Sequence, residues 1–321
     1  MNITNTHDIP LALAVWLVSD YYDYQNQENY ISATTLMKPI RQLVLGARTL
    51  RDGLTTDLSE YVARAMGNSL HDSIEKAWTE NYQKSLKILG YPDSMIDRVL
   101  INPTEQQLAS VQNPIPVYLE QRATAKVGKW TVGGKFDLVA DGVVHDNKST
   151  TVYSWINQDK DSDYALQGSI YRWLNQGKIT EDFIRINFIF TDWQRSMVNS
   201  KPEYPSARAQ HREIPLMSIA DTEKWITNKL IQIEKYWDLP DAQIPECTDE
   251  ELWRSNPVFK YYSDPTKTGG RSTRNFPTLV EANQYKAEKL KGVVLSVPGE
   301  PKRCNYCDAF AHCQQARRYF P

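Results

Sequence analysis

Apolar and polar positions alternate most clearly in three stretches of this 321-residue chain. Residues 183–190 are apolar at every second position, and the β-rich runs 136–140 and 143–148 are separated by Asp141-Gly142. A period of two predicts strands, and Asp-Gly between two such runs is a strong hairpin signal. We therefore predict an antiparallel hairpin over 136–148 and a further strand at 183–190.

Helical spacing is plainest in residues 57–89, where Leu70, Ile74 and Trp78 recur at intervals of four. Such a stripe predicts a long helix with one face toward a sheet. Further helices are predicted at residues 10–24, 34–51, 164–174 and 219–237. Strands at 117–149 and 183–190 between these helices predict a mixed α/β fold with a central mixed sheet.

Three regions are expected: a helical N-terminal cap (1–56), an α/β core (57–215) and a helical, cysteine-bearing C-terminal region (216–321) packed on the core. The apolar content of 41% is enough to bury a substantial core. No apolar run approaches the roughly 20 residues needed to span a bilayer. We expect a soluble protein of the cytoplasm, and nothing near Met1 resembles a secretion signal.

Two acids and a lysine come together on the predicted hairpin. Asp146 and Lys148 are two residues apart and project from one face of a strand, which Asp137 can approach from the partner strand. Two carboxylates with room for water suit Mg²⁺ or Mn²⁺, and a nearby lysine can orient or deprotonate a water or stabilise charge on a phosphate. Since this spacing is common by chance, ordinary solvated strand residues are the alternative.

Two helices flank this hairpin with further candidate residues. His71, next to Leu70, lies at the border of the apolar stripe, where it is either a structural histidine or a neutral metal ligand. Gln167 and Tyr171 are four residues apart, and therefore share one face of the predicted 164–174 helix.

The order of these motifs is informative. G-x₃-H on a helix, then G-x-x-D, D-x-K and Q-x₃-Y, between Gly67 and Tyr171, resembles the RecB-type exonuclease branch of the PD-(D/E)xK nucleases. The resemblance implies a restriction-endonuclease-like core, with a metal ion held by His71, Asp137, Asp146 and the Asn147 carbonyl. It also implies catalytic roles for further residues, namely Glu120, Lys148, Gln167 and Tyr171 beside the two aspartates.

The activity implied by this resemblance is Mg²⁺- or Mn²⁺-dependent hydrolysis of DNA from single-stranded or duplex ends, in phage DNA replication, recombination or repair. A recombination or replication protein is an additional expected partner. Two alternatives stay open: a catalytically silent nucleic-acid-binding subunit with the same fold, and a structure-specific endonuclease.

The chain has four cysteines, and the last three, Cys304, Cys307 and Cys313, form a C-x₂-C-x₅-C run. Closely spaced thiols suggest either a metal site or disulfides, and a reducing compartment favours metal. The run is similar to that of nucleases of this type that carry a 4Fe-4S cluster. Those have a fourth cysteine upstream of the core, but residues 37–41 hold no thiol, so Cys247 is the expected replacement. A structural Zn²⁺ is the alternative cofactor.

The formal net charge of −2 argues against a generally basic surface, so DNA binding must depend on local patches and on the metal. Residues 259–276 form one such patch, with Lys260, Lys267, Arg271 and Arg274 among aromatic residues. This segment either contacts a DNA strand or is an ordinary solvated loop or hairpin.

Overall fold

The computed structural model describes residues 2–20, 25, 27–49 and 55–320. Its contacts divide the chain into two compact units, one of Met1–Met37 with Arg51–Ile231 and the other of Lys38–Leu50 with Gln232–Pro321. The second unit therefore takes in residues 38–50, which the sequence placed with the N-terminal cap. The domain boundaries at residues 56 and 215 stay predictions.

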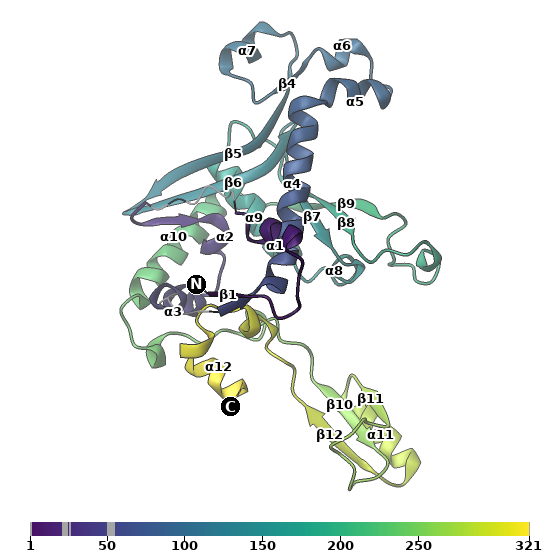
Figure 1. The fold of residues 1–321 in the computed structure, drawn as a ribbon. Coiled ribbons are helices and arrows are strands. Elements are labelled where there is room, and N and C mark those ends of the chain that lie inside the picture. The colour runs from purple at the N-terminus through teal and green to yellow at the C-terminus, as the bar shows by residue number, and fades with distance from the viewer. Residues whose placement is uncertain (1, 21–24, 26, 50–54, 321) are drawn as a thin grey trace. The chain divides into compact units, whose positions relative to one another are not determined.

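Within the described part of the first unit, seven strands form one mixed sheet (Figure 1). They are β2 (Tyr30–Ser32), β4 (Val99–Ile101), β5 (Ile115–Val127), β6 (Trp130–Ala140), β7 (Val143–Thr150), β8 (Phe183–Phe190) and β9 (Ala209–Pro215). Neighbours follow the order β4-β5-β6-β7-β8-β9, and β2 pairs with β6. The β4/β5, β7/β8 and β2/β6 pairs are parallel and the others antiparallel. The predicted mixed α/β fold is confirmed.

Helices and short accessory elements surround this sheet. They are β1 (Asn2–Thr4), α1 (Leu11–Val18), α2 (Ala33–Leu36), β3 (Thr55–Asp57), η1 (Leu58–Tyr61), α4 (Val62–Glu80), α5 (Tyr82–Ile88), α6 (Asp93–Ile96), α7 (Glu105–Ser110), α8 (Val152–Asn157), α9 (Asp161–Leu174) and η2 (Arg195–Met197). The helix predicted at 57–89 is split at Asn81, whose φ of −131° is not helical. Residues 21–24, 50 and 51 of two predicted helices lie outside the described residues.

The alternation that predicted β8 is reproduced in its burial. Ile184, Ile186, Phe188 and Phe190 are at most 1% exposed, and the residues between them are half-buried. Burying each such side chain contributes about 1.5–3 kcal/mol. The hairpin turn is also as predicted, because Asp141 and Gly142 both have positive φ, at 52° and 75°.

Helix α9 packs closely on the sheet because glycines lie at the contact. A Cβ added at Gly168 would lie 2.8 Å from Leu216 Cδ2 and 2.9 Å from Ile184 Cβ. By contrast, a Cβ added at Gly67 in α4 would meet no atom within 4 Å.

These two glycines predict stability changes of opposite sign. Gly168→Ala should destabilise the protein by about 1–3 kcal/mol, because the sheet must move to admit the methyl group. Gly67→Ala should stabilise it by about 0.5–1 kcal/mol, because alanine favours a helix interior and has open space here. Denaturation of both variants measures the shifts, and a stable Gly168→Ala protein would contradict the close α9 packing.

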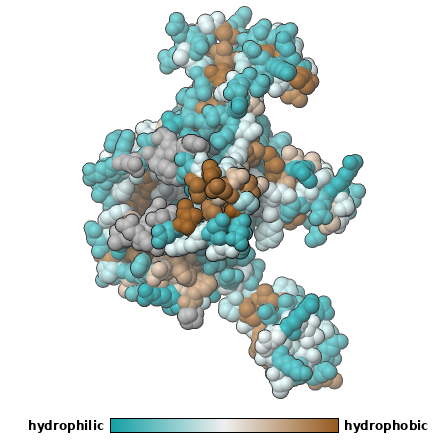
Figure 2. All heavy atoms as spheres, viewed as in Figure 1, coloured by the Kyte–Doolittle hydropathy of each residue, from teal (hydrophilic) through white to brown (hydrophobic). Residues whose placement is uncertain are grey.

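An apolar patch lies over α1 (Figure 2). This helix reads Leu-Ala-Leu-Ala-Val-Trp-Leu-Val, yet only Leu17 is buried, against Leu58 and Ala65. Leu11, Leu13 and Val15 are more than half exposed. Trp16 joins α1 to α4 by donating from Nε1 to Ser69 Oγ at 3.3 Å.

The second unit contains one helix from residues 38–50 together with the C-terminal segment from residue 232 onward. Its elements are α3 (Ile40–Arg48), η3 (Asp241–Gln243), β10 (Val258–Tyr262), β11 (Arg274–Phe276), α11 (Leu279–Lys289), β12 (Val293–Val297), η4 (Lys302–Tyr306), η5 (Phe310–His312) and α12 (Gln314–Tyr319). Helix α10 (Ile219–Tyr236) crosses the boundary between the two units.

Strands β11, β10 and β12 form a small antiparallel sheet under α11, with Tyr261, Phe276 and Ala282 at its core. The basic segment 259–276 thus supplies two strands and their connection. Arg274 lies over the rings of Phe276 and Tyr285 at 5.1 and 5.0 Å. A role of this segment in DNA binding stays a prediction. Among the described residues, no helix is both long and apolar enough to cross a membrane.

Candidate active site

Strands β6 and β7 separate at the point where the predicted aspartates lie. Their ladder ends at the pair Leu138↔His145, after which β6 stays paired with β5 and β7 with β8. Asp137 and Asp146 are the first residues beyond that last pair. The Asn147 N–H donates to Asp137 Oδ2 at 3.2 Å, so a carboxylate takes the place of a ladder partner. The strand fork therefore brings two carboxylates together with backbone groups that lie outside the β6–β7 ladder.

His71 reaches this fork from the middle of α4. Its Nδ1 lies 3.1 Å from Asp137 Oδ2, and its Nε2 lies 3.1 Å from the Asn147 carbonyl oxygen. The hydrogen bond to Asp137 raises the pKa of His71, against the opposing effect of burial. Asn147 is itself held in place, because its Oδ1 accepts from Asn187 Nδ2 at 3.0 Å. The histidine thus joins two groups that the sequence assigned to one metal.

Glu120 is the third member of the most compact donor group. It lies in β5 between the pairs Leu119↔Leu138 and Gln121↔Phe136, opposite Asp137. Donor atoms of His71, Glu120 and Asp137 all lie within 4.8 Å of one another. Glu120 has φ +50°, an unfavourable conformation for a non-glycine residue within a strand. Such strain persists where the surroundings enforce it and is concentrated at functional sites.

Asp146 and Lys148 form a buried pair next to this group. Lys148 Nζ lies 2.6 Å from Asp146 Oδ2, and the Asp146 side chain is 3% exposed. Burial raises the pKa of Asp146, and Lys148 opposes that change. Burial also opposes the charge of Lys148, but Asp146 and Asp137 outweigh it and raise the pKa of Lys148. The lysine is therefore held in its charged form.

Gln167 and Tyr171 approach the same aspartate from α9. Gln167 Nε2 lies 3.4 Å from Asp146 Oδ1 and 3.0 Å from the Tyr171 hydroxyl, to which it donates. Tyr171 is 5% exposed, and the aromatic edge of its ring would lie 3.0 Å from a Cβ at Gly134. Gln167 therefore contacts Asp146 directly, and Tyr171 contacts Gln167.

The residues at the fork fit a divalent cation. One donor atom each from His71, Glu120 and Asp137 lie within 4.8 Å of one another, close enough to hold one metal ion. Asp146 Oδ2 is buried and makes no well-oriented hydrogen bond to a described residue, although Lys148 is near. Carboxylate and carbonyl oxygens suit Mg²⁺ and Mn²⁺, and the imidazole favours Mn²⁺ of the two.

Two residues that the sequence did not single out also contribute to the site. Lys135, on β6, forms an ion pair with Glu120. The ring of Tyr164 lies 5.8 Å from Lys148 Nζ, and burial raises the pKa of Tyr164 to about 12. Lys135 lies within the G-x-x-D motif, so the sequence places it close to Asp137. Its pairing with Glu120 depends on the register of β5 with β6, which the sequence does not show.

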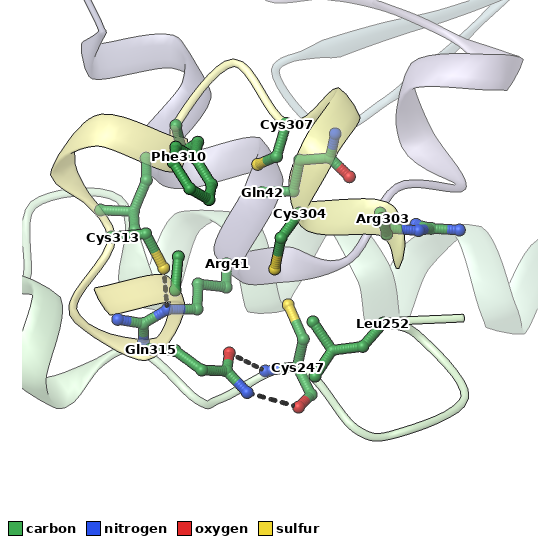
Figure 3. Close-up of a pocket in the computed structure, with 13 residues that line it drawn as sticks. Arg41, Gln42, Cys247, Leu252, Arg303, Cys304, Cys307, Phe310, Cys313 and Gln315 are labelled. Carbon is green, nitrogen blue, oxygen red and sulfur yellow. Dashed lines mark hydrogen bonds between the residues drawn. The ribbon is translucent and has the colours of Figure 1, made fainter. Parts of the chain in front are cut away.

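A second site lies in the other unit, where all four cysteines line one pocket (Figure 3). Cys304 and Cys313 are buried, and Cys247 and Cys307 are half-buried. None of the four forms a disulfide. Among the described residues, however, no three cysteine sulfurs lie within 4.8 Å of one another. The predicted iron–sulfur cluster therefore lacks the support of a compact sulfur cluster and stays a prediction.

Cys247 is fixed in this pocket through its backbone. Its N–H donates to Gln315 Oε1 at 2.8 Å, and Gln315 Nε2 donates back to its carbonyl at 2.8 Å. Gln315 is 3% exposed and lies in α12, the helix that begins directly after Cys313. Burial raises the pKa of Cys247 to about 12, so a metal would have to displace its proton.

Comparisons with known proteins give only distant likenesses. No protein-family model matches the chain, and neither does any curated protein. Among solved structures, SSO0001 is similar over 68% of this chain and 83% of its own, with 14% identity and a TM-score of 0.40. A phage related exonuclease from Haemophilus somnus 129PT is similar over 65% of this chain and 93% of its own, with 16% identity and a TM-score of 0.28. TM-scores below 0.5 do not establish a common fold.

Proposed function

We propose that the protein is a metal-dependent deoxyribonuclease that removes nucleotides from DNA ends. The observation that carries this proposal is the convergence of His71, Glu120 and Asp137 within 4.8 Å, next to the buried Asp146–Lys148 pair. Carboxylates from three strands, a histidine from a helix and a charged lysine fit hydrolysis of a phosphodiester better than binding alone.

Each residue has a proposed role. His71, Asp137, Asp146 and the Asn147 carbonyl would hold Mg²⁺ or Mn²⁺, with Glu120 as a further ligand. A bound ion of this kind lowers the pKa of a coordinated water and offsets negative charge on the phosphate.

Lys148 contributes through its fixed charge. Because neighbouring carboxylates keep it protonated, it is suited to orient the attacking water and to stabilise charge on the phosphate, not to remove a proton. Gln167 and Tyr171 hold Asp146 in place on the substrate side.

Basic side chains on the β5–β6 ribbon supply local positive charge for the DNA backbone. Arg122, Lys126 and Lys129 lie on these two strands or their connection. Arg122 donates to the Tyr30 hydroxyl at 2.9 Å, which fixes its direction. Local charge of this kind is needed because the chain as a whole carries a net charge of −2.

Because Glu120 belongs to the donor group of His71, Glu120 and Asp137, we expect Glu120→Gln to lose metal affinity. This change removes a charge but keeps the shape, and should weaken Mn²⁺ binding by about 10–100-fold. Glu75→Gln removes the same charge from α4, where Glu75 is close enough to act electrostatically on Glu120, but Glu75 is outside the donor group. Calorimetric titration with Mn²⁺ compares them, and equal affinities in the two variants would contradict a ligand role for Glu120.

Digestion of linear and circular DNA tests the proposed activity. The purified protein with Mg²⁺ or Mn²⁺ should shorten end-labelled linear strands, spare covalently closed circles, and stop on addition of a chelator. Cleavage of circles or of RNA would favour the endonuclease alternative. A phage setting and a recombination or replication partner stay predictions.

For the cysteines we propose a structural metal site, of which a 4Fe-4S cluster is the preferred occupant and Zn²⁺ the alternative. Four thiolate ligands suit either group. The preference for the cluster rests on the resemblance of the C-x₂-C-x₅-C run. The sulfur positions favour neither group, because no three of these sulfurs in the described residues lie within 4.8 Å of one another. Iron, sulfide and zinc analysis of anaerobically purified protein distinguishes them.

A further inference from the structure

A buried arginine contacts the cysteine pocket. Arg41, on α3, is 4% exposed and lines this pocket together with the four cysteines. A buried guanidinium is costly unless its N–H groups find partners. The hydrogen-bond and ion-pair partners of Arg41 therefore indicate its role in the pocket.

Three of these contacts join Arg41 to the segment that leads to Cys247. Its NH2 group forms an ion pair with Asp241. Its NH1 group donates to the carbonyl oxygens of Asp241 and Ile244, at 3.3 and 2.9 Å. Arg41 thus fixes the path of the chain that carries Cys247 into the pocket.

The fourth contact is to sulfur. Arg41 Nε donates to Cys313 Sγ at 3.1 Å (Figure 3). A neutral thiol is only a weak acceptor, whereas hydrogen bonds from a charged donor to an ionised acceptor are about twice as strong as neutral ones. The buried Arg41 guanidinium therefore fixes the direction of Cys313 Sγ within the pocket.

We infer that Arg41 is a positioning residue of the cysteine site, which orients Cys313 as a thiolate ligand and offsets part of the negative charge of the bound metal group. This inference rests on the metal site proposed above. Residues 37–41, where the sequence offered no upstream thiol, would thus contribute a cation to the site in place of a ligand.

The test compares metal retention in variants of the full-length protein purified without oxygen. Arg41→Gln should lose metal to a chelator about 10–100-fold faster than the parent, as expected when a partner of a ligand is removed. With iron bound, its reduction potential should become more negative, because hydrogen bonds to sulfur and nearby positive charge favour the reduced state. Arg41→Lys should restore part of both properties.

Arg48→Gln is the matched control. Arg48 lies two turns further along α3 and donates to the backbone carbonyl oxygens of Tyr236 and Leu239, but to no cysteine. It should retain metal and potential like the parent. If Arg41→Gln were poorly folded, the double change Arg41→Met with Asp241→Leu would remove both charges at similar volume, and should show the same fast metal loss.

The outcomes separate the two proposals. Native protein without iron or zinc would overturn the metal site and the role of Arg41 with it. Native protein with metal, but with Arg41→Gln unchanged in metal loss and potential, would overturn the role of Arg41 alone. Equal changes in metal loss and reduction potential in Arg41→Gln and Arg48→Gln would overturn the specific role of Arg41, because both changes would then act only through the stability of α3.

Discussion

Lys148→Ala is expected to lower the rate of DNA cleavage by the folded protein by about 10³-fold. The reason is that Lys148, which is held in its charged form 2.6 Å from Asp146, is the residue proposed to orient the attacking water and to stabilise negative charge on the phosphate. Single-turnover cleavage of an end-labelled DNA strand, with Mg²⁺ at saturation, measures the rate.

A control for this variant is available on α4. Lys76 is 69% exposed and its Nζ lies 3.9 Å from Glu80, away from the donor group. Lys76→Ala removes the same charge from the protein and should cleave DNA at close to the parent rate. If the two variants lost activity equally, or Lys148→Ala kept the parent rate, Lys148 would have no special role.

Cys304→Ser is the second variant with a large expected effect. Loss of one of the four proposed ligands should release the metal of the proposed site and lower the free energy of unfolding by about 4 kcal/mol or more, because a structural metal contributes directly to folding. Metal analysis and chemical denaturation measure the two changes.

Ala309→Ser gives the comparison for Cys304→Ser. Ala309 is 1% exposed and lines the same pocket. The added hydroxyl should cost only about 1–3 kcal/mol, as a buried polar group does, and the metal should stay bound. Full metal content in Cys304→Ser would exclude Cys304 as a ligand.

The strands were predictable wherever burial imposes alternation. β8 agrees with its predicted bounds because one face is buried throughout, and the Asp141-Gly142 turn requires positive φ that these residues tolerate. No alternation in the sequence predicts β9. It is an edge strand with a single buried residue, Ile214, so its pattern is mostly polar.

The candidate site was predictable in its members but not in its arrangement. Spacing along one strand places Asp146 and Lys148 together, and helical spacing does the same for Gln167 and Tyr171. The position of Glu120 depends on a left-handed backbone conformation within β5. It also depends on the pairing of β5 with β6, which places Glu120 opposite Asp137, 17 residues further along the chain. No local sequence pattern specifies either feature.

The cysteine pocket shows the same limit over a longer range. The C-x₂-C-x₅-C run is visible in the sequence, but Arg41 reaches Cys313 across 272 residues. Such contacts depend on tertiary packing, and no motif at residues 37–41 predicts them.

The most direct test of the central proposal is digestion of end-labelled linear DNA by the purified protein, with Mn²⁺, with Mg²⁺ and with a chelator, beside its Asp137→Asn variant. Release of nucleotides from the ends with either metal, and none with the chelator or the variant, is the expected result. Folded protein that leaves single-stranded and duplex DNA intact with both metals would contradict the proposed nuclease activity.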